Sequence, residues 1–336
     1  MFDYRFPFTL VIALLGACTC LAAPAHNTGI LDTAVLSSAQ TQTQAPRVRY
    51  RSRITVYDLK SRKMETIHTV DELLEAPNWS RDGGHLLVNM NGSLYRIAKD
   101  GQGGLQRVAL DAKYRCNNDH DYSPDGKLIA ISASTPESRG SRVYVINADG
   151  SNPRLVTPLS PSYFHGWSPD GKWLAFVGQR DKRYNLFRVS VNGGDEQRLT
   201  SKGDYDDGPD YSPDGKWIYF NSIRDGDWDI WRVPASGGGE ADKLAEQVTT
   251  DDWEDWFPHV SPDGKKMVFL SFPPKTGGHN GRMPVRLRMM KPPGKKAGAA
   301  KIETVAEIFG GQGTINVNSW SPDSQKFAFV VYEVIQ

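Results

Sequence analysis

The chain has 336 residues, with 40 lysines and arginines against 39 aspartates and glutamates, and a formal net charge of +1. Such a balanced composition provides no basic surface, so neither nucleic acid nor an anionic membrane surface is expected as a partner. Three cysteines are too few for a disulfide framework.

The first 25 residues differ from the rest of the chain. An apolar run over 8–17 follows a positive residue and precedes a small-residue site at 23–25, a pattern typical of a signal peptide over 1–25. The run is too short for a membrane-spanning helix. Residues 15–18 (LGAC) also resemble a lipoprotein cleavage site, in which Cys18 would carry a lipid. We therefore expect a periplasmic or extracellular protein that touches a membrane only through a lipid anchor.

A repeated motif organises the chain after a segment over 26–52, whose Thr, Gln, Ser and Ala content predicts a linker. A turn of the form Ser-Pro-Asp-Gly, with one substitution in the first and last copies, places its serine at positions 80, 123, 168, 212, 261 and 321. An aromatic residue commonly precedes the turn and an apolar run follows it, which predicts two antiparallel strands. A period in the forties with several short strands per unit is typical of a β-propeller.

The two ends of the chain complete one another in this scheme. Each unit continues with a hairpin around a Gly-rich turn, so we predict four-stranded antiparallel blades, with strands A to D from the centre outward. Residues 53–70 predict a C–D hairpin without an A–B pair, and residues 319–332 predict an A–B pair without a C–D hairpin. Pairing them closes the ring and leaves no open edge. We predict an all-β, six-bladed propeller over 53–336, one domain and a monomer.

One end of such a propeller should carry the chemistry. The B–C loops and the D–A crossovers share that end, and histidines, acids and aromatic rings gather in the crossovers over 116–121, 160–166, 202–210 and 250–259. The longest insertion, 272–284, is the fifth B–C loop. Because strand A lines the central channel, we expect these side chains to surround one funnel at its mouth. The candidate ligand-binding residues are Asn118, Asp119, His120, Tyr163, His165, Asp206, Asp207, Asp210, Trp253, Trp256, His259, His279 and Arg282.

Several interpretations of this group remain open. Aromatic faces beside polar groups suit a sugar and equally a protein interface. His120, His165 and His259 are candidate ligands of a divalent metal, although their spacing is no local metal signature. His165 or His259 could serve as a catalytic base. Alternatively, each histidine packs between blades and bonds a backbone carbonyl, and the acidic loops are simply solvated.

The repeats resemble a known family. Units such as DYSPDGKLIAI (121–131) and DYSPDGKWIYF (210–220) resemble the TolB-like β-propeller repeat, and the likeness covers nearly all of 53–332. The resemblance implies an exported propeller that serves as a protein-docking platform, here without the α/β domain that precedes the propeller in TolB. The repeat is also similar to that of prolyl-oligopeptidase-like peptidases, but no G-x-S-x-G motif follows. It is similar, too, to that of oligogalacturonate lyase, whose histidines hold a metal at the channel mouth.

Together these observations give one expectation and one alternative. We expect an exported TolB-like propeller that binds a carbohydrate or protein ligand at the mouth formed by the D–A and B–C loops. The alternative is a metal-assisted or histidine-based polysaccharide lyase or hydrolase. If His165 and His259 only bind ligand, replacing either should change the folding stability by about 1 kcal/mol, the net worth of one hydrogen bond.

Overall fold

The computed structural model describes residues 48–279, 281–294 and 301–335. The predicted signal peptide, Cys18 and most of the predicted linker lie outside the described residues. The first strand begins at Arg49, so the folded domain includes the end of the segment expected to be a linker. No helix among the described residues is long and apolar enough to cross a membrane.

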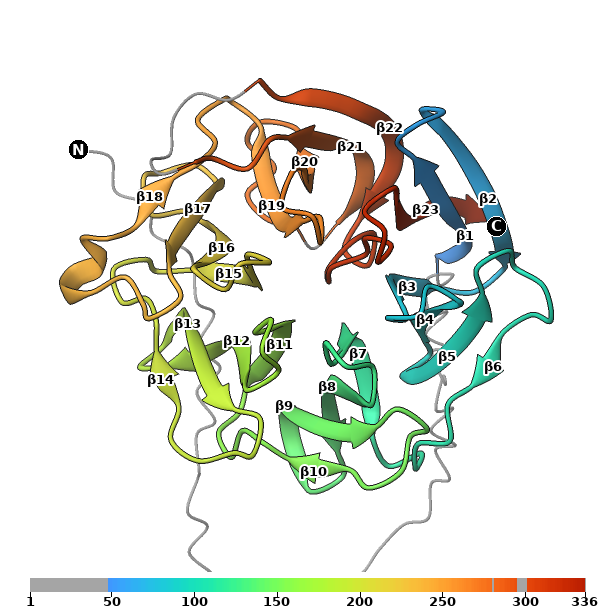
Figure 1. The fold of residues 1–336 in the computed structure, drawn as a ribbon, viewed down its shortest axis with the longest axis horizontal. Coiled ribbons are helices and arrows are strands. Elements are labelled where there is room, and N and C mark those ends of the chain that lie inside the picture. Colours follow the sequence, from blue (N-terminus) through green and yellow to red (C-terminus); the bar gives the residue numbers. More distant parts are fainter. Residues whose placement is uncertain (1–47, 280, 295–300, 336) are drawn as a thin grey trace, which may run out of the picture. The chain divides into compact units, whose positions relative to one another are not determined.

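The described residues form six antiparallel sheets around a central channel, which confirms the predicted six-bladed propeller (Figure 1). In each complete blade the first strand lies innermost and the fourth outermost. Blade 1 comprises β3 (Leu74–Trp79), β4 (His85–Met90), β5 (Ser93–Ala98) and β6 (Gln106–Arg107). Blade 2 comprises β7 (Arg115–Tyr122), β8 (Leu128–Thr135), β9 (Ser138–Asn147) and β10 (Arg154–Leu155). Blade 3 comprises β11 (Ser162–Trp167), β12 (Trp173–Arg180), β13 (Arg183–Ser190) and β14 (Gln197–Arg198).

The outermost strand is short in most blades. Blade 4 comprises β15 (Asp206–Tyr211), β16 (Trp217–Ser222), β17 (Asp229–Pro234), the 3-10 turn η1 (Glu240–Asp242) and β18 (Glu246–Gln247). Blade 5 comprises β19 (Glu254–Val260), β20 (Met267–Phe272), β21 (Arg282–Met290) and β22 (Glu303–Gly311). Among the five complete blades, only β22 forms a long outer ladder, from Arg282↔Gly311 to Met289↔Glu303.

The repeated turn is stabilised by its own serine and aspartate. Ser212 Oγ donates to Asp214 Oδ1 (2.7 Å) and accepts from the N–H of Trp217 (3.0 Å), so one side chain bridges both strands. Gly215 has φ +69° and its N–H donates to the Ser212 carbonyl at 2.8 Å, a conformation that favours glycine. The Ser–Asp bond recurs in all six copies at 2.5–2.7 Å. The sequence motif is thus a turn motif.

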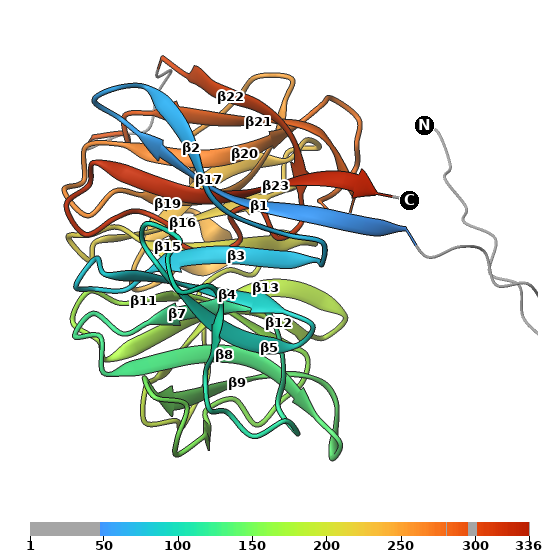
Figure 2. The same ribbon diagram turned by 90° about the vertical axis from the view of Figure 1, so that its right-hand side faces the viewer.

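The chain ends close the ring as predicted. β23 (Lys326–Ile335) pairs with β1 (Arg49–Asp58) over ten residue pairs, and β1 pairs with β2 (Lys63–Val70), in what we call the closing blade. Figure 2 shows β1 and β23 lying side by side. The expected innermost strand of this blade is reduced to one bridge, Trp320↔Phe327. The preceding segment turns on itself, because Gly311 and Gly313 donate to the side chains of Thr314 and Asn316.

Apolar clusters fill the spaces between blades, and indole groups tie adjacent blades together. The residue before the motif serine is buried in all six copies and is aromatic in five of them, with Val260 in the fifth copy. Trp167 Nε1 donates to the Asp121 carbonyl of the preceding blade (3.1 Å), and Trp320 Nε1 donates to the His259 carbonyl (3.0 Å). Neighbouring blades therefore hold the inner strands at fixed positions around the channel.

Candidate functional site

A β-bulge interrupts the inner strand of each complete blade, near the end where the chain enters it. The register shifts lie between Glu75 and Asn78 in β3, and at the corresponding places in β7, β11, β15 and β19. Bulges redirect side chains and are frequent beside functional sites. Here the residues at and beside the bulges line the mouth of the channel.

A cavity of about 200 Å³ occupies this mouth. Its residues come from four complete blades and from the segment before β23, so it is a site of the whole ring. Six predicted residues meet there: Asn118, Asp119, Tyr163, His165, Asp207 and His279. The cavity is also lined by Asn117, Tyr184, Tyr205, Phe257, Gln312 and Asn316.

Asp207 is the centre of the charge network in the cavity. Its Oδ1 accepts from the Gly208 N–H (2.7 Å) and lies 3.2 Å from His165 Nε2. Its Oδ2 accepts from the Tyr205 hydroxyl (3.5 Å) and lies 4.0 Å from His279 Nε2. Burial by itself would raise the pKa of this carboxyl, but the hydrogen bond and charge of His165 lower it below its ordinary value. Asp207 is therefore ionised.

His165 is held as a buried imidazolium. Its Nδ1 faces the Asn316 carbonyl at 3.2 Å, so both ring nitrogens face oxygen acceptors. Burial disfavours the charged ring, but the charge of Asp119 and the bond to Asp207 outweigh it and raise the pKa to about 9. A ring that donates from both nitrogens has no lone pair for a metal or for a substrate proton. This geometry does not suit a catalytic base.

Asp119 and His279 are the less satisfied polar groups. Asp119 accepts one bond from Asn117 Nδ2 (2.7 Å), and burial, partly offset by His165, raises its pKa to about 6. His279 packs on Trp256 with ring centroids 4.2 Å apart. Burial lowers the pKa of His279, so the ring is neutral near pH 7, and its Nδ1 has no hydrogen-bond partner.

His259 and Asp210 form a separate network that does not line the cavity. His259 Nδ1 faces Asp210 Oδ2 (3.1 Å) and its Nε2 faces the Ile315 carbonyl (2.7 Å). Asn318 Nδ2 also donates to Asp210 Oδ2 (2.9 Å). These contacts join blades 4 and 5 to the segment before β23. His259 thus matches the alternative of a histidine that packs between blades.

His120 is buried against blade 1. Its Nδ1 lies 3.3 Å from Asn78 Nδ2, and burial lowers its pKa to about 3, so the ring is neutral. Among the described residues, no three His, Cys, Asp or Glu side chains form a group that could hold a metal ion. The metal hypothesis for His120, His165 and His259 gains no support from this geometry, because His165 and His259 each have both ring nitrogens against oxygen acceptors.

Four further predicted residues lie outside the cavity. Asp206 is buried 3.0 Å from the Arg224 guanidinium, which also contacts Asp242 at 3.5 Å. Because β-strand side chains alternate in direction, Asp206 and its neighbour Asp207 serve opposite faces of β15. Trp256 is fully buried beneath His279.

Trp253 and Arg282 complete that set. Trp253 lies in an outer cleft, where Arg286 stacks at 4.1 Å from its ring centroid. Arg282 pairs with Glu75 (2.7 Å) and lies 4.8 Å from the Tyr332 ring, so it joins blades 5 and 1 to the closing blade.

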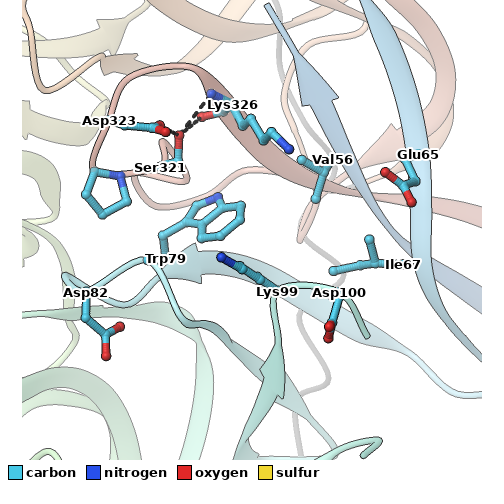
Figure 3. Close-up of a pocket in the computed structure, with 12 residues that line it drawn as sticks. Val56, Glu65, Ile67, Trp79, Asp82, Lys99, Asp100, Ser321, Asp323 and Lys326 are labelled. Atoms are coloured by element: carbon cyan, nitrogen blue, oxygen red, sulfur yellow. Dashed lines mark hydrogen bonds between the residues drawn. The ribbon is translucent and has the colours of Figure 1, made fainter. Parts of the chain in front are cut away.

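A second pocket of about 420 Å³ lies at the opposite end, between the closing blade and blade 1 (Figure 3). Trp79 lies on one side of it, and Lys99 and Lys326 lie among the carboxylates of Glu65, Asp100 and Asp323. The charges have both signs, so this pocket favours no class of ligand by charge. It shares no residue with the cavity at the channel mouth.

Comparisons with known proteins agree with the fold. A family model described as the TolB beta propeller domain matches residues 121–283. An uncharacterized protein of Agrobacterium fabrum is 44% identical over 282 residues, which cover 84% of this chain and 92% of that protein. The chain belongs to the TolB-like β-propeller family. A solved structure from Agrobacterium tumefaciens, described as a candidate TolB, superposes with a TM-score of 0.78 at 42% identity and covers 86% of this chain and all of that one.

Similarity to TolB proteins of the Tol-Pal system is more partial. The TolB of Francisella tularensis is 27% identical over 133 residues, which are 39% of this TolB-like chain and 30% of the relative. The TolB structure from Acinetobacter baumannii superposes with a TM-score of 0.58 at 16% identity, which shows a common fold.

Proposed function

We propose that this TolB-like propeller is an exported interaction protein that binds a segment of another protein at the channel mouth. One observation carries the proposal: side chains from four complete blades and the segment before β23 meet in one cavity that contains buried charges and unpartnered polar atoms. Buried polar atoms in a protein core nearly always have a hydrogen-bond partner, so unpartnered ones at a concave surface favour a binding role. A protein-interaction role also fits the family. Export rests on the signal-like sequence over 1–25.

The size of the cavity favours a protein segment over an oligosaccharide. Its volume is about 200 Å³, whereas pockets that enclose organic ligands are commonly about 300–1,000 Å³. One inserted side chain fits this space, while a sugar chain would rest mostly outside it. A carbohydrate ligand is the second candidate, since tyrosine rings and amides line the mouth. The lyase alternative gains no support, because neither His165 nor His259 has a free ring nitrogen.

Selection of binders by the purified protein tests this proposal. We would present the full chain with a display library of random peptides and with a glycan array. Peptides should bind, and they should lose binding to a Gln312→Trp variant, because Gln312 is half-buried at the cavity and an indole there fills it. Asp252→Trp is the matched control, since Asp252 is exposed on the same end and does not line the cavity.

The outcomes separate the candidates. Peptide binding that Gln312→Trp abolishes and Asp252→Trp preserves would support the proposal. Binding that both variants preserve would place the ligand elsewhere and refute the site. Glycans that bind with the same dependence on Gln312, with no peptide selected, would replace the protein ligand with a carbohydrate.

A further inference from the structure

The cavity has more hydrogen-bond acceptors than donors to satisfy them. The Gln312 Oε1 and His279 Nδ1 atoms are buried without a partner. The nearby Asp207 carboxylate favours the His279 tautomer protonated at Nε2, which leaves Nδ1 as an acceptor. Asp119 accepts from Asn117 through Oδ2, and its Oδ1 accepts no bond from the described residues. Three acceptors on one small cavity are therefore free for donors of a ligand.

The cavity also carries an excess of one negative charge, because the single imidazolium of His165 serves the carboxylates of both Asp119 and Asp207. His165 and Asp207 form an ion pair, and the second N–H of His165 is directed at the Asn316 carbonyl. Asp119 is only 4% exposed and forms no salt bridge with any residue that the structure describes. A buried carboxylate is expensive unless a cation accompanies it. A cation placed beside Asp119 by a ligand would offset this cost.

The walls of the cavity suit a cation on an apolar stem. Tyr163, Tyr184, Tyr205 and Phe257 line it, with the Tyr184 and Tyr205 rings edge to face at 4.9 Å. Aromatic faces attract ammonium groups and pack well against methylene chains. His279 itself stands edge-on to Phe257, with centroids 5.3 Å apart, so its orientation is fixed by packing.

We propose that the ligand inserts an alkylammonium group, as at the end of a lysine side chain, into this cavity. An ammonium has three donors and no acceptor, which matches Asp119, His279 and Gln312. Its charge compensates Asp119, and its stem lies against the aromatic walls. This inference rests on the proposed function, because it assumes that the cavity is the ligand site.

Titration calorimetry with n-butylammonium chloride tests the chemistry directly, with 1-butanol as the neutral probe of similar length. We expect n-butylammonium to bind and 1-butanol not to bind. Asp119→Asn, which keeps the shape and removes the charge, should weaken n-butylammonium binding at least tenfold. Asp252→Asn removes an exposed carboxylate at the same end and should leave the affinity unchanged.

A second variant protects the test against misfolding of Asp119→Asn. Gln312→Lys supplies an ammonium from a half-buried position, and Gln312→Met supplies a similar stem without charge. Gln312→Lys should melt at a higher temperature than Gln312→Met, and the difference should vanish in combination with Asp119→Asn. Equal melting temperatures for the two Gln312 variants would contradict the inference, as would equal binding of 1-butanol or full binding by Asp119→Asn.

Failure of this inference is distinguishable from failure of the proposed function. If selected peptides require an open cavity but contain no lysine and bind Asp119→Asn normally, the proposed function stands and the ammonium inference is refuted. If n-butylammonium binding depends on Asp119 but the selected peptides bind Gln312→Trp as tightly as the wild type, the cavity chemistry is supported and the docking site is refuted.

Discussion

Replacing His165 with glutamine should destabilise the fold far more than loss of a single neutral hydrogen bond. The ring stands between two buried carboxylates, and its pKa of about 9 exceeds the ordinary 6.5. That difference corresponds to about 3 kcal/mol of preference for the charged, folded form. Removing one partner of a buried ion pair commonly costs about 3–5 kcal/mol, which is consistent. The value of about 1 kcal/mol expected from the sequence is therefore too small for His165.

Urea unfolding of the wild type and His165→Gln at pH 6.5 and pH 9.5 measures this effect. Because the folded-state pKa is the higher one, the stabilisation is complete below pH 6.5 and is lost as the pH rises through 9. The difference in unfolding free energy between the two proteins should therefore shrink by about 3 kcal/mol over this range. His68→Gln is the control, since burial lowers the pKa of that half-buried ring, the opposite direction to the shift at His165. A difference that stays constant from pH 6.5 to 9.5 would show that His165 is not charged.

Three further outcomes are expected. Deleting β23 (326–335) should abolish the cooperative thermal transition seen by circular dichroism. Each large buried side chain of this strand contributes about 1.5–3 kcal/mol, whereas the total folding stability of a domain is about 5–15 kcal/mol. An unchanged melting temperature would contradict ring closure. Mass spectrometry of the mature protein should show that residues 1–25 are removed, or that the chain begins at a lipidated Cys18 which Cys18→Ser abolishes; retention of Met1 would refute export. The affinity for n-butylammonium, measured by calorimetry, should fall about tenfold from pH 7.5 to pH 5. The reason is that Asp119, with a pKa of about 6, becomes protonated over this range, while His165 stays charged and Asp207 stays ionised. An affinity that does not change with pH would exclude Asp119 as the anion.

The blades could be predicted because one local motif determines them. Ser212, Asp214 and Gly215 form their turn through bonds within six residues, so the sequence alone displays the whole unit. The pairing of the chain ends could be predicted because one end contains only a C–D hairpin and the other only an A–B pair, and together they make one four-stranded blade. The innermost strand of the closing blade was predicted but is reduced to one bridge, since the side chains of Thr314 and Asn316 satisfy backbone groups that a strand would use.

The site could be predicted only in part. The topology correctly brought together Asp119, His165, Asp207 and His279, because it depends on which end of each strand faces the mouth. The topology could not tell which of two consecutive strand residues, such as Asp206 and Asp207, faces the channel. Tyr205 lies in the predicted crossover over 202–210 and Gln312 lies in the segment before β23, yet the roles of both depend on packing between blades. The ion pair of His165 with Asp207, formed between blades 3 and 4, has no sequence signature at all.

The bulge explains how one repeated strand can serve both the core and a variable site. Side chains alternate between the two faces of a strand, so the extra residues of a bulge change which face the following side chains occupy. The bulge thereby separates the residues that line the channel from the repeated turn motif that follows them in the chain. In blades 1, 4 and 5 the bulge contains a residue of positive φ that is followed directly by a proline. These residues are Ala76, Gly208 and Phe257. A large ring with φ +55° is strained by about 1–3 kcal/mol. The ring of Phe257 stacks on His165 with centroids 6.1 Å apart and stands edge-on to His279 at 5.3 Å. The strained bulge residue of blade 5 thus packs against both histidines of the cavity.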